Sequence, residues 1–421
     1  MTSQANGSSS LTVVIKLGTS SIVDEKTREP ILSNLTLIVE TAARLRKDGH
    51  RVIIVSSGAI GVGLRRMDED ERPKHLPRKQ ALAAVGQCRL MSLWDSLFEH
   101  LRIPVAQILL TRNDIADRIQ YTNAQNTFSE LLDMGVVPIV NENDTLAVAE
   151  IKFGDNDTLS AITAAMVKAD YLFLMTDVDC LYTANPRNDP SAKPIEVVSD
   201  ISCLRADVST SGSALGTGGM GTKIVAARLA TSAGVTTVIT RSSKPGNIHE
   251  IVSYLQKTRE DPDAASTLDP PPLHTRFLPA TIPIHSRSFW LLHGLTPHGN
   301  LYIDSGAYAA LLKKASLLPA GVVAVDGHFG QQEAVRLFVV EKRSATALDG
   351  DFPSHADEPR EVGRALVNYG SKEIDLIKGA RSSHIRTILG YADSEYVALR
   401  ENIAFFIESE ISSGAASPAL R

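Results

Sequence analysis

The chain has 421 residues, of which 43% are hydrophobic and 22% are charged, and its formal net charge is −5. These proportions are typical of a folded globular protein and exclude a disordered or fibrous chain, while the length predicts two domains. The small acidic surplus argues against nucleic acid or an anionic membrane as the main partner, and no apolar run approaches the roughly 20 residues that span a bilayer.

The N-terminal residues 1–10 are rich in serine and lack the basic and apolar regions of a secretory signal, so we expect a disordered tail there. Three cysteines, Cys88, Cys180 and Cys203, do not share the spacing of metal ligands. Buried and reduced thiols in a cytoplasmic protein are the simplest interpretation.

A first strand is predicted over residues 11–17, and Lys16 interrupts its apolar run. An ammonium group is costly to bury unless an anion meets it, so Lys16 either contacts an acidic group or reaches solvent from an edge strand. A second strand, from residue 51, runs into Ser56, Ser57, Gly58 and Gly61. Small residues at the end of a strand let a ligand approach the backbone, which suits a carboxylate or a phosphate.

Four more apolar runs predict the remaining strands, with helical patterns between them. These strands are expected over residues 103–111, 136–140, 170–182 and 235–240. Strands that alternate with helices favour an α/β three-layer sandwich around a mainly parallel sheet. Polar clusters at the carboxyl ends of the strands then mark the edge where such sheets bind ligands. A long helix over 79–101, apolar on one face, is expected in the core or at a subunit contact.

The stretch from 136 to 162 combines a buried strand with a dense polar cluster. Asp144, Asp155, Asn156 and Asp157 follow the strand closely, and an apolar helix begins at Asp157. Carboxylates this close repel one another unless a cation or a lysine gathers them. Ordinary turn residues and a helix N-cap are the alternative for each residue taken by itself.

The segment GTGGMGTK, residues 216–223, is similar to a phosphate-binding Walker A loop without matching it. That motif ends in Gly-Lys-Ser/Thr and follows a strand, whereas this segment ends in Gly221-Thr222-Lys223 and follows a polar stretch. Its glycines still expose backbone N–H groups, and a lysine stands where a helix starts. We therefore expect a phosphate cradle of another lineage, with a mobile loop as the alternative.

Two lysines, Lys16 and Lys223, an acid that can hold them and a glycine cradle are the parts that phosphoryl transfer requires. No histidine falls in these segments of the sequence. An alcohol acceptor needs a general base, whereas a carboxylate acceptor is already ionised at pH 7. The residues therefore favour an acyl phosphate as the product.

Seven motifs stand in the order found in the amino acid kinase family, which the chain resembles densely from residue 11 to about 260. They are KLGTSS, SSGAIGVG, LLTRND, PIVNENDT, FGDNDTLSA, MTDVDCLYTANPR and GTGGMGTK. The resemblance implies ATP-dependent phosphorylation of the γ-carboxylate of L-glutamate to L-glutamyl 5-phosphate, the first step of proline biosynthesis, with proline as a feedback inhibitor. Related activities on N-acetylglutamate, carbamate or aspartate stay open as alternatives.

The same resemblance implies roles for individual residues. Lys16 and Lys223 stabilise the moving phosphoryl group, and Asp157 orients them. Asp114 matches the position that couples glutamate binding to inhibition by proline. Magnesium is implied by the nucleotide and not by a protein motif. The residues that match the glutamate site are Ser57, Asp144 and Asn156. Those that match the ATP site are Lys16, Thr176, Asp177, Thr217, Gly218, Gly219, Met220, Gly221, Thr222 and Lys223.

A Pro- and Asp-rich segment at 258–272 separates the last third of the chain. Beyond it, short alternating runs predict a small β-rich domain with a resemblance to the PUA fold. Residues 401–411, ENIAFFIESEI, are predicted to form a terminal helix. The expected organisation is a kinase domain over 11–262, a linker over 263–280, the PUA-like domain over 281–395 with an insertion near 341–361, and a C-terminal tail over 396–421.

PUA modules are often associated with RNA, but acidic residues outnumber basic ones from residue 281 onward. A structural or regulatory role is therefore favoured for this domain, and an RNA-binding regulator is the alternative function. We further expect a homo-oligomer without membrane contact. Acyl phosphates hydrolyse readily, so transfer of the product to a glutamyl phosphate reductase is an option that the sequence leaves open.

Overall fold

The computed structural model describes residues 10–146, 156–184, 189, 191–201, 204, 219–261, 267–281, 283–284, 286–340 and 359–406. The chain divides into two compact units, Met1–Ile284 and His285–Arg421, each of which is described by itself. In the described part of the chain, no helix combines the length and the apolar character needed to cross a membrane.

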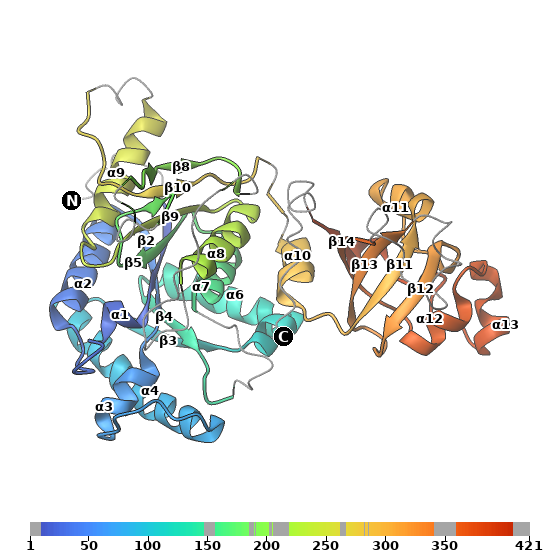
Figure 1. Cartoon of the computed structure of the whole chain (residues 1–421), viewed down its shortest axis with the longest axis horizontal. Coiled ribbons are helices and arrows are strands. Elements are labelled where there is room, and N and C mark those ends of the chain that lie inside the picture. Colours follow the sequence, from blue (N-terminus) through green and yellow to red (C-terminus); the bar gives the residue numbers. More distant parts are fainter. Residues whose placement is uncertain are drawn as a thin grey trace. The chain divides into compact units, whose positions relative to one another are not determined.

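An eight-stranded sheet belongs to the first unit and forms its centre (Figure 1). Neighbouring strands from β3 to β9 are parallel, and β10 is antiparallel to β9. The predicted, mainly parallel α/β sheet is therefore confirmed. The strand order is β3 (Val105–Leu110), β4 (Val137–Glu142), β2 (Arg51–Ser56), β1 (Thr12–Leu17), β5 (Tyr171–Thr176), β9 (Thr236–Arg241), β10 (Thr275–Phe277) and β8 (Val197–Val198).

Strand β1 lies inside this sheet and carries Lys16. Lys16 is in register with Val55 of β2 and with Leu174 of β5. Because these strands are parallel, their carboxyl ends reach the same edge of the sheet. That edge collects the polar segments that follow β1, β2, β4 and β5.

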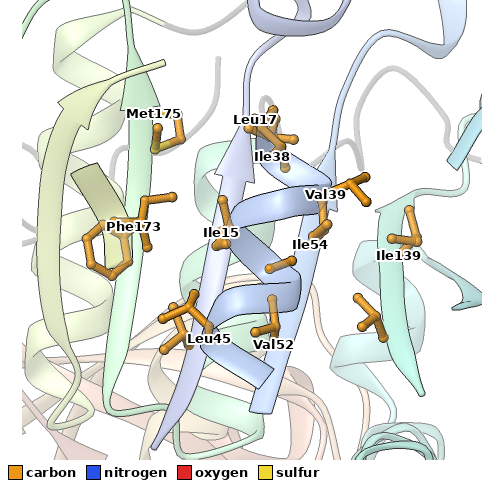
Figure 2. Packing of buried hydrophobic residues seen from close by; sticks show 14 of the residues in the cluster. Ile15, Leu17, Ile38, Val39, Leu45, Val52, Ile54, Ile139, Phe173 and Met175 are labelled. Carbon is orange, nitrogen blue, oxygen red and sulfur yellow. The ribbon is translucent and has the colours of Figure 1, made fainter. Parts of the chain in front are cut away.

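A hydrophobic core fills the space between one face of the sheet and α2 (Leu32–Lys47) (Figure 2). Ile15 and Leu17 of β1 belong to this core together with Ile38 of the helix, and all three are fully buried. Each side chain of this kind stabilises the fold by about 1.5–3 kcal/mol when it leaves water. Because successive side chains of a strand point to opposite faces, Lys16 points away from this core.

The opposite face of the sheet is covered by α7 (Asn156–Met166) and α8 (Met220–Ser232), which pack against each other. Helix α7 contacts β1, and α8 contacts β9. Asp157 and every residue from Leu159 to Met166 are buried. Burial of the Asp157 carboxylate in such surroundings requires charged or hydrogen-bonding partners.

Glycines allow two further helices of the first unit, α3 (Ala59–Arg66) and α4 (Leu76–Glu99), to approach each other closely. A Cβ atom on Gly63 would overlap a carbonyl oxygen of α4, and one on Gly86 would overlap a carbonyl oxygen of α3. The remaining elements are α1 (Thr19–Ile22), α5 (Arg112–Ala116), α6 (Arg118–Asp133), α9 (Asn247–Glu260) and the antiparallel pair β6 (Leu181–Tyr182) and β7 (Pro194–Ile195).

The second unit has its own five-stranded sheet and its own hydrophobic core, to which Leu301, Val335 and Ile374 belong. The predicted β-rich second domain is therefore confirmed. The strand order is β12 (Val322–Gly327), β11 (Gly299–Asp304), β13 (Ala334–Val340), β14 (Arg360–Leu366) and β15 (Ile403–Phe405). The helical elements are α10 (Ser286–Phe289), η3 (Trp290–Gly294), α11 (Ser305–Leu312), η4 (Pro319–Gly321), α12 (Ser371–Ile377), η6 (Ser382–His384), α13 (Ile385–Leu389) and η7 (Arg400–Asn402).

The terminal helix expected over 401–411 is wrong in its described part. Residues 403–405 form β15, because Ile403 and Ala404 pair with β14 across the sheet. This strand also lies inside the stretch 396–421 that was expected to be a tail. A short run of β-branched and aromatic residues can form its backbone hydrogen bonds in a sheet as readily as in a helix. The presence of a partner strand determines which of the two structures forms.

Three other boundaries also differ. Strand β10 lies within the expected linker 263–280, since it pairs with β9 and β8. The strand expected over 170–182 ends at Thr176, after which a loop leads to β6. Of the insertion expected near 341–361, residues 341–358 lie outside the described residues, and Arg360 already belongs to β14.

Candidate functional site

Asp157 joins two lysines from distant parts of the chain. Lys16 comes from β1, and its Nζ lies 2.5 Å from Asp157 Oδ1. Lys223 comes from the first turn of α8, and its Nζ lies 3.5 Å from Asp157 Oδ2. All three side chains are buried, with Asp157 at 0% exposure. The structure thus brings together the three residues that the sequence singles out for catalysis.

Two ammonium groups keep Asp157 ionised. Burial by itself raises the pKa of this carboxyl, but the charges of Lys16 and Lys223 and the hydrogen bonds from Lys16 and Thr222 together outweigh burial, and the pKa of Asp157 lies below its ordinary value. Among these three side chains, one anion stands between two cations. A buried cluster of this composition favours an anionic ligand such as a phosphate group.

The start of α8 is tied to the same carboxylate through Thr222. Its Oγ1 lies 2.7 Å from Asp157 Oδ2 and 2.8 Å from the carbonyl oxygen of Gly219, and it accepts from the Gly219 N–H at 3.0 Å. Because a hydroxyl has one proton, Thr222 donates to one of these two oxygens at a time. Met220 and Gly221 lie in the first turn of α8, where backbone N–H groups lack helical partners and suit an anion.

Asn156, the residue before Asp157, belongs to a chain of neutral polar side chains. Its Nδ2 donates to Ser57 Oγ at 2.8 Å and to Asn141 Oδ1 at 3.1 Å. Asn141 Nδ2 in turn donates to Gln87 Oε1 at 2.8 Å. These side chains come from α7, the turn after β2, β4 and α4. We call Ser57, Asn156, Asn141 and Gln87 the amide chain.

A sharp turn between β2 and α3 holds Ser57 in this chain. Gly58 has a φ of +97°, in the left-handed region that glycine adopts without strain. The turn leaves Ser57 only 8% exposed, so its hydroxyl lies inside the site. Asn156 Nδ2 also approaches the carbonyl oxygen of Ser56 at 3.4 Å. The predicted turn of small residues therefore contributes the Ser57 hydroxyl to the site, in addition to backbone groups that a ligand can approach.

The other predicted residues lie near neighbouring strand ends. Asp144 lies in the turn after β4. Thr176 ends β5, and its hydroxyl lies 3.2 Å from Asp177 Oδ1. Asp114 lies in α5, where its carboxylate accepts from the backbone N–H and the hydroxyl of Thr111 at 2.6 and 2.7 Å. The residues Thr217, Gly218 and Asp155 lie outside the described residues.

Local sequence patterns do not identify an ion pair close to Thr176. Arg241 ends β9 in register with Thr176, and its Nε and Nη2 each lie 2.7 Å from a carboxylate oxygen of Asp179. The hydrogen bonds from Arg241 lower the pKa of Asp179, and the same bonds raise the pKa of the guanidinium. This two-point contact ties the loop after β5 to the end of β9.

Asn141 and Gln87 are the other two site residues that the sequence patterns miss. Asn141 stands in the motif PIVNENDT, where it is indistinguishable from a turn residue. Gln87 occupies the buried face of α4, which also contains Ala83, Leu90 and Trp94. A single amide on an otherwise apolar face is the signal that could have marked it, since a buried amide needs a partner.

Both units match known proteins. Residues 11–241 match the amino acid kinase family, and residues 299–389 match the PUA domain. The chain is 57% identical over 393 residues to a probable glutamate 5-kinase of Schizosaccharomyces pombe. This alignment covers 93% of this chain and 92% of that protein. It is 49% identical over 419 residues to an uncharacterized protein of Saccharomyces cerevisiae (94% and 98% covered). It is 48% identical over 394 residues to a glutamate 5-kinase of Cyanothece sp. (93% and 98% covered).

Proposed function

This chain belongs to the amino acid kinase family, and we propose that it transfers the terminal phosphoryl group of ATP to the γ-carboxylate of L-glutamate. The product is L-glutamyl 5-phosphate, the first intermediate of proline synthesis. The observation that carries the proposal is the buried Asp157 held between the ammonium groups of Lys16 and Lys223. The identity of the acceptor follows from the similarity to proteins named glutamate 5-kinase.

Lys16 and Lys223 act on the phosphoryl group as it moves. A γ-carboxylate oxygen of glutamate forms the new P–O bond, while the bond from the γ-phosphorus to the bridging oxygen breaks and ADP leaves with that electron pair. Catalysis of this step depends on positioning and on neutralising charge on the moving group, which two buried ammonium groups supply. The carboxylate is ionised at pH 7, so no base has to remove a proton. Asp157 holds the two ammonium groups apart.

The amide chain suits an amino acid as the acceptor. Asn156 uses its Nδ2 on Ser57 and Asn141, while its Oδ1 is buried and has no hydrogen-bond partner among the described residues. A buried acceptor of this kind gains from a donor, and the α-ammonium group of glutamate is one. Asp144 supplies a negative charge near the same strand end. The γ-carboxylate of the substrate then faces the neighbouring lysines.

The nucleotide is proposed to lie along the start of α8 and the end of β5. The residues assigned to it are Lys16, Thr176, Asp177, Thr217, Gly218, Gly219, Met220, Gly221, Thr222 and Lys223. Magnesium is proposed to arrive with the nucleotide, since Mg²⁺ is commonly held by substrate phosphates and water. This arrangement fits the donor set, because both oxygens of Asp157 already face ammonium groups.

Inhibition by proline through Asp114 is a further proposal. Asp114 tethers the segment after β3 through Thr111, and Leu109 of β3 is in register with Asn141 of β4. A ligand that shifts this segment therefore acts on the amide chain through the adjoining strand. A homo-oligomer, transfer of the product to a reductase and a cytoplasmic location are proposed on the same family grounds, and the PUA domain is proposed to be structural or regulatory.

The decisive experiment is ADP release by the full-length chain across a panel of carboxylic acids. We expect kcat/KM for L-glutamate to exceed that for aspartate, N-acetylglutamate and carbamate by about 100-fold or more, since unpaired polar groups in the site penalise the wrong acceptor. Equal turnover of any of the three would overturn the choice of glutamate. Addition of proline to the same assay tests the inhibition, which is expected to raise the glutamate requirement.

A further inference from the structure

We propose that Gln87 of α4 is a positioning residue for the acceptor site, because its Oε1 and the Glu142 N–H together hold Asn141 and, through Asn141, Asn156. Gln87 is only 9% exposed and contacts the predicted substrate residues through this chain. The inference rests on the proposed function for the identity of the acceptor. It adds a residue from a helix that none of the motifs assigns to the site.

A backbone N–H group determines which way each amide points. The N–H of Glu142 donates to Asn141 Oδ1 at 2.9 Å, and a backbone N–H can only donate. Asn141 Nδ2 must therefore point away from that N–H and toward Gln87. It donates to Gln87 Oε1 at 2.8 Å. Asn141 Oδ1 also receives Asn156 Nδ2, and this leaves Asn156 Oδ1 for the substrate. The Glu142 N–H thus sets the donor and acceptor direction of every hydrogen bond in the amide chain, as far as the proposed acceptor site.

The packing of α4 fixes the position of Gln87. The preceding residue, Gly86, lies against the backbone of Ala59 at the start of α3. Ala59 follows the turn that holds Ser57, so α4 is locked to that turn. About two helical turns further along α4, Trp94 Nε1 donates to Ser56 Oγ at 3.3 Å. Helix α4 therefore holds both ends of the amide chain at a fixed distance.

Removal of the Gln87 amide is expected to change binding more than folding. The change leaves Asn141 Nδ2 without its acceptor, so the Glu142 N–H alone orients Asn141 and its hold on Asn156 weakens. It also removes Gln87 Nε2, which is buried and has no partner among the described residues. One unsatisfied group replaces another, so the melting temperature should move little. The affinity for the acceptor should fall.

The test is Gln87→Met, which keeps the length of the side chain, in the full-length protein. We expect KM for glutamate to rise roughly ten-fold, while kcat and KM for ATP stay within about two-fold, as for loss of a contact that serves only the acceptor. An unchanged KM for glutamate, or an equal rise in both KM values, would overturn the proposal. Gln87→Leu is the second variant if Gln87→Met does not accumulate as folded protein.

Leu90→Ala is the matched control, because Leu90 lies on the same buried face of α4 but outside the amide chain. It should lower the melting temperature without changing KM for glutamate. An increase in KM equal to that of Gln87→Met would show that general loosening of α4 explains the effect, and the proposal would fall.

A double-mutant cycle with Ser57→Ala tests whether Gln87 acts through the chain. If it does, the double variant raises KM for glutamate by clearly less than the product of the two single effects. A rise equal to that product means independent action and overturns the proposal. The wild-type acceptor panel comes first, so failure of glutamate as a substrate is recognised separately. The cycle is then measured with whichever acid proves the best acceptor.

Discussion

Asn156 and Asp157 are consecutive residues in the first turn of α7, yet their side chains belong to two different kinds of site. Asp157 gathers charge, with Lys16 and Lys223 on its two oxygens. Asn156 gathers neutral groups, and the Ser57 hydroxyl and the Asn141 carbonyl oxygen both accept from its Nδ2. One helical turn therefore places the charged cluster, the proposed phosphoryl site, against the amide chain of the proposed acceptor site.

The two sites differ in what they can recognise. Buried charge interacts strongly with another charge whatever its shape, so the lysine cluster suits the phosphates of any nucleotide. Hydrogen bonds with fixed donors and acceptors discriminate between molecules of equal charge, because the wrong molecule leaves a buried group unpaired. The contrast predicts that variants of the charged site affect stability and turnover, and that variants of the amide chain affect the acceptor KM.

The largest effect should come from Asp157→Asn, because this change leaves two buried ammonium groups without their anion. We expect a loss of about 3–5 kcal/mol in the free energy of unfolding, as is typical when one partner of a buried ion pair is removed. Urea denaturation measures it. A loss below about 1 kcal/mol would mean that the ion pairs of Asp157 with the two lysines do not stabilise the fold. The expected difference between the charged cluster and the amide chain would then be contradicted.

The same variant sharpens the contrast through pH. The folded-state pKa of Asp157 lies below its ordinary value of 3.8, so its ionised form stabilises the fold above that pH. This contribution is lost as the pH falls through the lower, folded-state pKa. The melting temperature of the wild type should therefore decline more steeply below pH 3.8 than that of Asp157→Asn. Parallel curves would contradict the assignment.

Lys16→Ala and Lys223→Ala should each lower kcat by at least about 100-fold, or roughly 2.7 kcal/mol in transition-state stabilisation. Each variant removes one positively charged side chain that is proposed to stabilise the moving phosphoryl group. Coupled release of ADP at saturating substrates gives kcat, and circular dichroism checks the fold. If both variants turned over at near-normal rates, the lysines would have a structural role alone and the charged site would lose its proposed function.

Ser57→Ala should have the smallest effect, a rise of about ten-fold in KM for glutamate with kcat changed by less than about three-fold. The variant removes the hydroxyl that receives Asn156 Nδ2 but leaves the charged cluster intact. Initial rates over a range of glutamate concentrations at saturating ATP measure the two constants. A fall in kcat as large as that of the lysine variants would erase the distinction between the two sites.

The sequence predicted the sheet and the charged cluster because both leave local signals. The strands are short apolar runs that end in small or polar residues, and a lysine inside the apolar run of residues 11–17 predicted either an anionic partner or an edge strand. The family motifs then pointed to Asp157 and Lys223 as its companions. Motif spacing alone could not show that one carboxylate contacts both lysines.

The parts that local patterns missed depend on pairing between distant residues. Gln87 resembles any polar residue of a long helix until β4 brings Asn141 to it. Strand β10 is only three residues long, and it is a strand because β8 and β9 lie on either side of it. Strand β15 likewise exists because β14 lies beside it. Contacts between residues far apart in the chain are not encoded in the periodicity of either segment.

The glycines at the crossing of α3 and α4 carry a consequence for engineering. Replacing a glycine inside a helix by alanine is a standard route to greater thermal resistance, since alanine restricts the unfolded chain. At Gly63 and Gly86 the added methyl group would force the two helices apart. Attempts to harden this enzyme against heat should therefore spare both positions and choose exposed helical sites away from this crossing.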